Sequence, residues 1–350
     1  MLSNPFTLSF GEEPSQYISR HQQINEIIDS FSGDTPTAHV YMISGVRGSG
    51  KTVMLADISD SFSQKKDWIV ISVTPDSDIL HSIAAKLYSI PELKKLFTSA
   101  KLDLSAFGLG VHIDTANQIF DIDTAIEKML EQIKKKGRKV LITIDEIVKN
   151  DSVKYFAGVF QILVRQKLPV FLLMTGLYDN IYNLQNEKTL TFLYRAPKIA
   201  LEPLSLNAIS RSYESVLKVD RVKADQMAKL TCGYAFAYQV LGYIYWNKFI
   251  KKKSSGTIED LISEYDGLLE EYVYEKLWFE LSPKEKDIIA IISERGTVKV
   301  EEIRDTLSMT SGNMAVYRDR LIKKGLVDGS RYGYLSLKLP RFGDIIRIWI

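Results

Sequence analysis

The sequence predicts an α/β protein with a mainly parallel sheet, followed by a helical region and a small C-terminal module. Short apolar runs alternate with helical patterns up to Pro203, strand signals then stop, and the pattern changes again at Leu281. Buried strands that alternate with helices are typical of a parallel sheet covered on both faces. We therefore expect three domains, at residues 1–203, 204–280 and 281–350.

Five short apolar runs are the expected strands of this sheet. They are Ala38–Ser44, Trp68–Val73, Lys139–Ile144, Pro169–Met174 and Ile199–Leu201. Residues 102–114 (LDLSAFGLGVHID) alternate in polarity around two glycines and predict a hairpin insertion within 101–116. That hairpin either caps the sheet as a surface loop or contacts a partner.

The composition indicates a globular protein of more than one domain. The 350 residues are 45% hydrophobic and 25% charged, without an excess of Gly or Pro. The longest apolar run, Tyr234–Trp246, is interrupted by Gln239 and Gly242, so we expect no membrane span. Cys232 is the only cysteine, which excludes an internal disulfide, and the first residues lack a secretory pattern. We expect a cytoplasmic protein.

A complete phosphate-binding motif follows the first strand. Residues 45–52 read GVRGSGKT, which matches G-x-x-x-x-G-K-[ST] between a predicted strand and a predicted helix. In such a loop the backbone N–H groups surround the phosphates, Lys51 reaches the terminal phosphates and the Thr52 hydroxyl binds Mg²⁺. The expected nucleotide-binding residues are Gly45, Val46, Arg47, Gly48, Ser49, Gly50, Lys51, Thr52 and Val53. The alternative is a Gly-rich turn that binds nothing.

Two adjacent carboxylates end the third strand. Asp145 is placed to hold Mg²⁺ together with Thr52, and Glu146 is placed to orient and deprotonate the attacking water. On its own such a pair could equally be a helix-capping acid. With a phosphate loop in the same chain, we expect an ATP or ADP site with Mg²⁺.

At these motifs the chain resembles the AAA+ P-loop ATPases, in the bacterial and archaeal branch near the origin-recognition initiators and the STAND signalling ATPases. The resemblance covers nearly the whole chain and implies a P-loop NTPase sheet, a helical lid and a C-terminal winged helix. It also implies that Arg20, Tyr17 and Ile18 line the base and ribose pocket, although Ser19 replaces the glycine expected before the arginine.

The resemblance adds two candidate catalytic residues. Thr175, after the fourth strand, would sense the γ-phosphate, unless its hydroxyl is instead satisfied by the turn at Gly176. Arg195, before the fifth strand, would reach the nucleotide of a neighbouring subunit, unless it is an exposed ion-paired arginine. The second role implies an ATP-dependent homo-oligomer.

The segment CGYAFAYQVLGYIYW resembles the branch's lid helix, in which Gly-x-Pro approaches the nucleotide. Gly233 and Tyr234 are followed here by Ala235, so the proline is missing. The aromatic residues of this segment are expected in the lid core rather than in a binding site; they are Tyr234, Phe236, Tyr238, Tyr243, Tyr245 and Trp246.

The last 70 residues predict three helices and a two-stranded wing, a winged helix-turn-helix. This part carries 13 Lys and Arg against 9 Asp and Glu, a net charge of +4. If it binds duplex DNA, the third helix would enter the major groove. The expected contacts are Arg318, Arg320, Lys323, Lys324, Arg331 and Lys338. The alternative is a protein-contact surface.

The resulting hypothesis is a slow ATPase that acts as a switch and is coupled to DNA or a protein partner. A nucleotide-loaded scaffold that does not hydrolyse ATP and a DNA-binding regulator are the alternatives. A nucleotide kinase is a remote option, because the sequence has no acceptor-binding motif.

Overall fold

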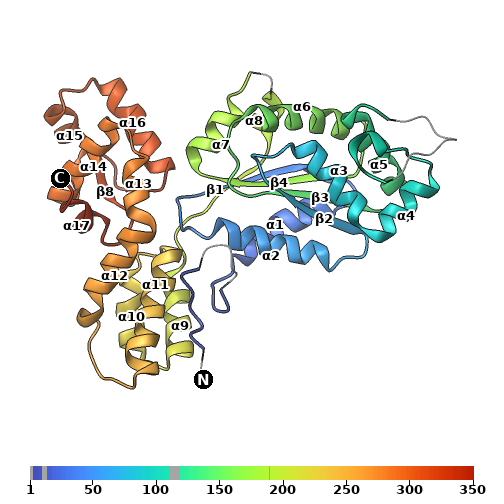
Figure 1. The fold of residues 1–350 in the computed structure, drawn as a ribbon. Helices are drawn as coiled ribbons and strands as arrows, with labels where there is room; N and C mark the ends of the chain where they lie inside the picture. The colour runs from blue at the N-terminus through green and yellow to red at the C-terminus, as the bar shows by residue number, and fades with distance from the viewer. Residues whose placement is uncertain (1–2, 10–13, 111–118, 189) are drawn as a thin grey trace. The chain divides into compact units, whose positions relative to one another are not determined.

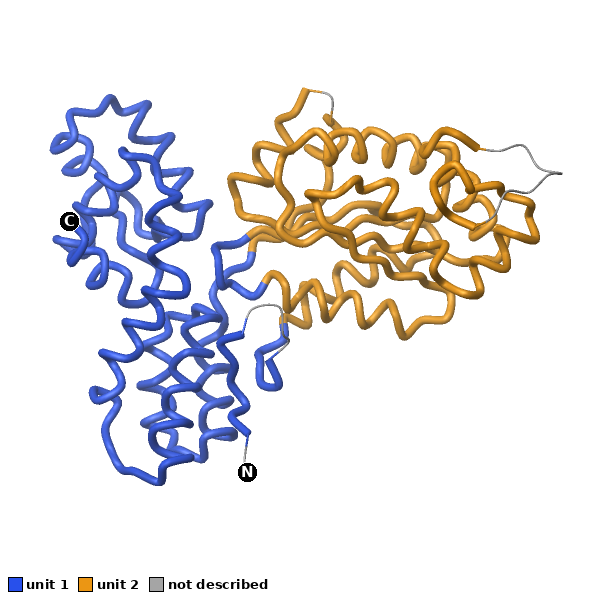
Figure 2. Tube along the Cα trace, in the orientation of Figure 1, with its two compact units in different colours: residues 1–19, 45–50, 201–350 blue, residues 20–44, 51–200 orange. Residues whose placement is uncertain are grey.

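The computed structural model describes residues 3–9, 14–110, 119–188 and 190–350. These form two compact units, each made of segments that are discontinuous in the chain (Figure 2). The first consists of residues 1–19, 45–50 and 201–350, and the second of residues 20–44 and 51–200. We call them the helical unit and the sheet unit.

The sheet unit contains a five-stranded, all-parallel sheet in the order β2-β3-β4-β1-β5. The strands are β1 (Val40–Ser44), β2 (Trp68–Val73), β3 (Lys139–Ile144), β4 (Val170–Gly176) and β5 (Lys198–Ala200). The expected α/β class and the five strands are therefore confirmed, with strand ends shifted by one or two residues.

Helices cover both faces of this sheet (Figure 1). They are α1 (His21–Ser32), α2 (Lys51–Ser63), α3 (Ile79–Ser89), α4 (Pro91–Ser99), α5 (Ile122–Lys135), α6 (Asp151–Arg165), α7 (Tyr178–Gln185) and α8 (Thr191–Arg195). Strand β3 is buried at every position after Lys139, as an apolar strand with helices on both sides must be.

The two sides of the sheet differ in composition. Aromatic rings pack toward α1 and α2, where the ring centroids of Phe31 and Tyr41 are 5.5 Å apart and those of Phe62 and Trp68 are 4.2 Å apart. Aliphatic side chains pack toward α3, α5 and α6, with Val40 and Met42 of β1 in that core. The alternation of Val40, Tyr41 and Met42 between the faces follows from the two-residue repeat of a strand.

The predicted hairpin insertion is described only in part. Residues 102–110 contain a 3₁₀ turn, η1 (Ser105–Phe107), and no strand, while residues 111–118 lie outside the described residues. Gly108 and Gly110 both adopt positive φ, which suits a turn. The residues that would follow this turn in the hairpin lie outside the described part of the chain, so the hairpin stays a prediction.

The helical unit begins with the helices of the expected lid. They are α9 (Leu206–Leu217), α10 (Arg221–Leu230), α11 (Ala235–Tyr245), η2 (Trp246–Lys251), η3 (Glu259–Leu261), α12 (Ile262–Leu269), η4 (Glu270–Tyr274) and α13 (Glu275–Phe279). Phe6 of the N-terminal segment is buried against them, with its ring centroid 5.5 Å from that of Tyr238.

The end of the chain adds four helices and a small antiparallel sheet to the same unit. The elements are α14 (Pro283–Arg295), β6 (Val298–Lys299), α15 (Val300–Thr306), α16 (Ser311–Lys323), β7 (Val327–Asp328), β8 (Tyr334–Leu337) and α17 (Phe342–Ile346), with strand order β6-β8-β7. Ser282 and Glu285 form a capping box that starts α14.

Among the described residues, no helix combines the length and the apolar character needed to cross a membrane.

Candidate phosphate-loop site

Residues 45–50 connect β1 to α2 in the chain, so the phosphate motif lies between a strand and a helix as expected. Gly48 and Gly50 have φ values of +75° and +92°, which side chains with a Cβ rarely adopt. A Cβ at Gly48 would also overlap the Tyr234 hydroxyl. The loop therefore requires glycine at Gly48 for two independent reasons.

Lys51 and Thr52 open α2, a helix of 13 residues. The first N–H groups of a helix have no partner within the helix, and the helix dipole favours negative charge at this end. The Lys51 side chain is buried and Thr52 is exposed. The start of α2 thus combines an anion-binding backbone with a cationic side chain and a hydroxyl at the surface.

Thr52 contacts the expected metal-binding carboxylate directly. Its hydroxyl donates a hydrogen bond of 2.8 Å to Oδ2 of Asp145, although the two residues are 93 positions apart. The other carboxylate oxygen, Oδ1, accepts the hydroxyl of Thr175 and the backbone N–H of Glu146, the latter at 3.0 Å. Asp145 is therefore fixed from three sides at the carboxyl end of β3.

Thr175 joins the carboxyl ends of β3 and β4. Its fully buried hydroxyl donates to Asp145 and accepts the Glu146 N–H at 3.2 Å, and its carbonyl accepts the Ile147 N–H at 2.7 Å. The Thr175 hydroxyl is thus satisfied by the two acidic residues rather than by the turn at Gly176, the partner considered from the sequence.

Glu146 has an unusual backbone conformation. Its φ is +51°, in the left-handed region, although it is not a glycine, and its side chain is exposed. Such a conformation costs free energy and persists where surrounding contacts enforce it, often at active sites. Here the enforcing contacts are the two hydrogen bonds accepted from its N–H by Asp145 and Thr175.

Within the helical unit, the start of α11 binds the backbone of the phosphate loop. The Tyr234 hydroxyl donates to the carbonyl of Arg47 at 2.5 Å, and the Phe236 N–H donates to the carbonyl of Gly48 at 3.0 Å. Burial raises the pKa of the Tyr234 phenol well above its ordinary value, so it stays a donor. Both contacts use carbonyl groups and leave the N–H groups of Arg47 and Gly48 to other partners.

A side-chain contact joins the same loop to the end of α13. Arg47 Nη2 lies 2.9 Å from Glu280 Oε1. These contacts span 187 or more positions, and only the absence of the proline expected after Tyr234 marks this segment in the sequence. Sequence reasoning assigned Tyr234 and Phe236 to the lid core, which is also where they pack.

The structure also places the four other residues expected near a nucleotide. Arg20 precedes α1, and its carbonyl accepts the Ile24 N–H. Ile18 packs on the core of the helical unit and Tyr17 is half-buried. Arg195 ends α8 with an exposed side chain.

Most of the basic residues expected to contact DNA have partners within the chain. Arg320 and Lys324 both pair with the buried carboxylate of Glu285, Lys323 with Asp319 and Lys338 with Glu202; Arg318 donates to the Gly329 carbonyl and Arg331 lies over the Tyr334 ring. Burial would raise the pKa of Glu285, but the hydrogen bonds from Lys324 and Ser282 outweigh it and hold that pKa below its usual range.

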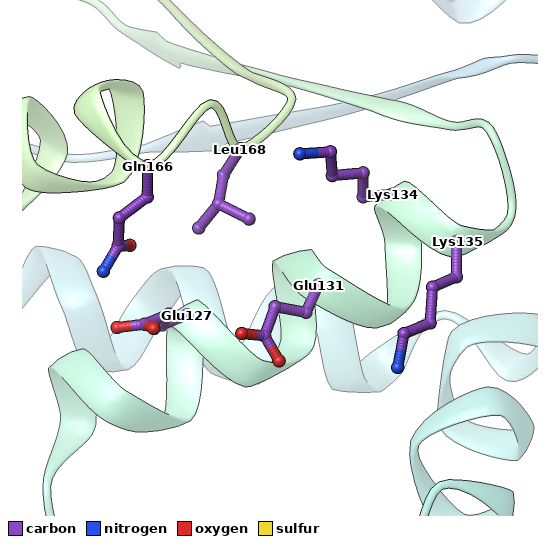
Figure 3. Close-up of a pocket in the computed structure, with 6 residues that line it drawn as sticks. All are labelled: Glu127, Glu131, Lys134, Lys135, Gln166 and Leu168. Atoms are coloured by element: carbon purple, nitrogen blue, oxygen red, sulfur yellow. The ribbon is translucent and has the colours of Figure 1, made fainter.

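A hollow of about 420 Å³ lies elsewhere in the sheet unit (Figure 3). Glu127, Glu131, Lys134 and Lys135 of α5 face Gln166 and Leu168 of the turn before β4. Its charges are mixed, and Lys134 is already bonded to the Lys167 carbonyl at 2.9 Å. It contains none of the residues of the phosphate-loop site.

Comparison with known families decides the class of the site. Residues 17–172 match the model of an ATPase domain predominantly from Archaea. This part of the chain is therefore similar to that ATPase domain. The resemblance drawn from the phosphate motif is therefore confirmed. Residues 271–346 match a domain of unknown function (DUF8462). No curated protein sequence matches the chain significantly.

A solved structure with a TM-score above 0.5 supports the same fold over nearly the whole chain. The Aeropyrum pernix ORC2 protein, solved in ADPNP–ADP complexes, is similar with a TM-score of 0.59 and 14% identity over 97% of this chain and 96% of that one. Cdc6p from Pyrobaculum aerophilum has a TM-score of 0.48 and 15% identity, over 97% and 95%. A STAND protein with a tetratricopeptide repeat sensor from Pyrococcus horikoshii has 0.42 and 17%, over 95% of this chain and 43% of that one.

Proposed function

We propose that this AAA+ protein binds Mg-ATP and hydrolyses it slowly to ADP and phosphate, as a switch. The observation that carries the proposal is the 2.8 Å hydrogen bond between Thr52, the last residue of the phosphate motif, and Asp145. It joins the end of the P-loop to the carboxylate that directly follows strand β3. This contact with Asp145 favours a nucleotide site over a Gly-rich turn that binds nothing.

The donor set fits Mg²⁺. Mg²⁺ prefers hard oxygen ligands and is held by one or two protein groups together with substrate phosphates. Among the described residues there is no group of three or more His, Cys, Asp or Glu side chains that could form a complete protein cage. Thr52 and Asp145 would hold the ion, which neutralises charge on the β- and γ-phosphates when bound.

The chain's own residues supply binding, orientation and proton transfer. The N–H groups of residues 46–51 and the Lys51 ammonium bind the phosphates. Glu146, held by its own N–H, accepts a proton from the water that attacks the γ-phosphorus, and the γ-phosphoryl to β-phosphate oxygen bond breaks to release ADP. Thr175 positions Glu146 and Asp145 relative to each other.

Phosphate release tests this proposal against the non-hydrolysing scaffold. Glu146→Gln is expected to retain nucleotide binding and to lose roughly tenfold or more of the steady-state release rate. Lys51→Ala is expected to lose nucleotide binding. Equal phosphate release by wild type and Glu146→Gln would refute hydrolysis by this site and favour the non-hydrolysing scaffold. Absence of ATP or ADP binding by wild type at millimolar levels would refute both hypotheses.

We infer that 1–203, 204–280 and 281–350 act as ATPase domain, lid and winged helix-turn-helix. Supporting the last assignment is the order α14, β6, α15, α16, β7, β8, in which β7 and β8 pair as the wing would. Supporting the lid assignment are the bonds from Tyr234 and Phe236 to the loop carbonyls, which give nucleotide binding a path to the helices.

Duplex DNA is a second candidate ligand, because α16 has an exposed face and the wing residue Arg331 is exposed. All six expected basic contacts have partners within the chain, but Lys324, Lys338 and Arg318 are half-buried, whereas Arg320, Lys323 and Arg331 keep exposed side chains. Neutralising three phosphates predicts a slope of about −3 for log K against log salt, instead of about −5 for six. DNA binding that does not depend on salt would refute this phosphate-contact proposal.

Self-association is the remaining part of the proposal. Arg195 is exposed, as an arginine that reaches a neighbouring subunit's nucleotide must be. Mass measurement with ADP and with a non-hydrolysable ATP analogue tests it. Assembly only with the analogue, lost in Arg195→Ala, supports the role, and a monomer in both conditions refutes it.

A further inference from the structure

The helical unit has a groove that combines one exposed and two half-buried aromatic rings with carboxylates. Its volume is about 510 Å³, and its lining comes from α12, η4, α13 and Trp349 near the end of the chain. Helices α12 and α13 are labelled in Figure 1. It is lined by Glu270, Glu271, Glu275, Trp278, Phe279 and Trp349. A volume between 300 and 1,000 Å³, roughly, is typical of sites that bury a small ligand or an anchoring side chain.

The aromatic side of the groove is built rather than accidental. The ring centroids of Trp278 and Trp349 are 6.1 Å apart with an interplanar angle of 51°, and the Trp349 indole N–H donates to Glu270 Oε1 at 2.9 Å. Phe279, next to Trp278 in the sequence, leaves 70% of its surface exposed, while Trp278 and Trp349 are half-buried. Clustered exposed aromatic surface of this kind marks an interaction site.

The carboxylate side of the groove is negatively charged. The described contacts include no ion pair of Glu271 or Glu275, and the groove is lined by three glutamates and no lysine or arginine. Three carboxylates beside aromatic faces favour a cation and repel phosphate. This charge excludes nucleic acid as the occupant.

The chain itself shows that these rings accept a cationic group. The Lys286 ammonium lies 5.3 Å from the centroid of Trp278 and 5.8 Å from that of Phe279. Both distances are within the range of cation–π attraction.

The backbone of the groove is also irregular at this point. Residues Glu270–Tyr274 form a π-helical turn between α12 and α13. Such turns are rare and occur frequently at functional sites. This one carries Glu270 and Glu271, and Glu275 follows it directly.

We propose that this groove binds an arginine side chain in a basic, partly apolar segment of a partner protein. A planar guanidinium stacks on an indole and pairs with a carboxylate through two parallel N–H groups, which an ammonium cannot do. The aliphatic residues beside the arginine contact Phe279 and Trp349. This interaction is separate from nucleotide binding.

Peptide titration of the full chain without nucleotide tests the proposal. The probe is an acetylated, amidated peptide of four Gly-Arg-Leu repeats, with four Gly-Lys-Leu and four Gly-Glu-Leu repeats as comparisons, followed by calorimetry at low salt. The variant Glu271→Gln/Glu275→Gln removes surface charge without removing packing. The matched control, Glu127→Gln/Glu131→Gln, removes the two carboxylates of the hollow in Figure 3.

The arginine peptide is expected to bind wild type and the matched control equally, and to bind Glu271→Gln/Glu275→Gln about tenfold more weakly. The lysine peptide is expected to bind several-fold more weakly than the arginine peptide, and the glutamate peptide not at all. Absence of binding at millimolar peptide, equal loss in the matched control, equal binding of the lysine and arginine peptides, or displacement of the peptide by duplex DNA would overturn the proposal.

Discussion

Replacement of Thr175 by valine tests the network that fixes the two acidic residues. Valine keeps the shape of the fully buried side chain but removes the hydroxyl that donates to Asp145 and accepts from Glu146. A hydrogen bond to a carboxylate contributes about 1.5–3 kcal/mol. The Glu146 N–H still donates to Asp145 Oδ1 at 3.0 Å in the valine variant. Loss of its second hydrogen bond, to the Thr175 hydroxyl, therefore adds only about 0.5 kcal/mol.

We therefore expect Thr175→Val to lower the free energy of unfolding by about 2–3 kcal/mol. Thr175→Ser is the control, because it keeps the hydroxyl and loses one buried methyl group, worth about 1 kcal/mol. Urea denaturation followed by tryptophan fluorescence measures both variants. If valine is as stable as serine, the hydroxyl does not stabilise the network.

The same pair of variants separates positioning from packing in catalysis. If Thr175 positions Glu146, Thr175→Val is expected to reduce phosphate release by about 10- to 100-fold while nucleotide affinity changes by less than about threefold. Thr175→Ser is expected to retain most of the rate. Equal rates in the two variants would contradict the positioning role.

Three further predictions concern other contacts. Gly48→Ala is expected to abolish tight nucleotide binding in a titration with labelled ADP, because the positive φ and the Tyr234 hydroxyl both oppose a Cβ. The control is Gly158→Ala, in the interior of α6, where an added Cβ would have no atom within 4 Å. It is expected to raise the free energy of unfolding by about 0.5–1 kcal/mol. Tyr234→Phe leaves the Arg47 carbonyl without this donor and is expected to cost about 1–2 kcal/mol of stability, with weaker nucleotide binding; unchanged affinity would separate the lid contact from the site. Glu285→Gln is expected to cost about 2–3 kcal/mol at pH 7. Because the folded-state pKa of Glu285 is lowered, this stabilisation is present above the unfolded pKa near 4.5 and is lost as pH falls through the folded-state pKa. The difference in unfolding free energy between wild type and Glu285→Gln should therefore shrink below about pH 4.5.

The sheet and the phosphate motif could be predicted from the sequence because their signals are local. An apolar strand, a glycine turn and a helix follow one another within a few residues at Gly45–Thr52, and strand β3 ends directly in Asp145. Parallel strands bring their carboxyl ends to one edge, so the meeting of Thr52 with Asp145 follows from topology. Thr175 follows in the same way from β4, which lies beside both β3 and β1.

The contacts of the loop with α11 and α13 could not be predicted in this way. Tyr234, Phe236 and Glu280 are separated from the loop by most of the chain, and their residue types are ordinary for a lid core or a helix end. Only the missing proline after Tyr234 marked the segment as unusual. The left-handed backbone of Glu146 also has no sequence signal, because it results from hydrogen bonds between two strand ends.

The net charge of +4 at residues 281–350 is a poor guide to what this module binds, because the charge is distributed by pairing. Glu285 pairs with both Arg320 and Lys324 of the helix expected to enter the DNA groove, and Lys324 is half-buried while Arg320 stays exposed. Counting basic residues therefore overestimates the phosphates that α16 can neutralise, and a salt slope near −3 would be the direct consequence. A measured slope near −5 would instead mean that DNA breaks the Glu285 pairs, in which case Glu285→Gln should strengthen DNA binding while it weakens the fold.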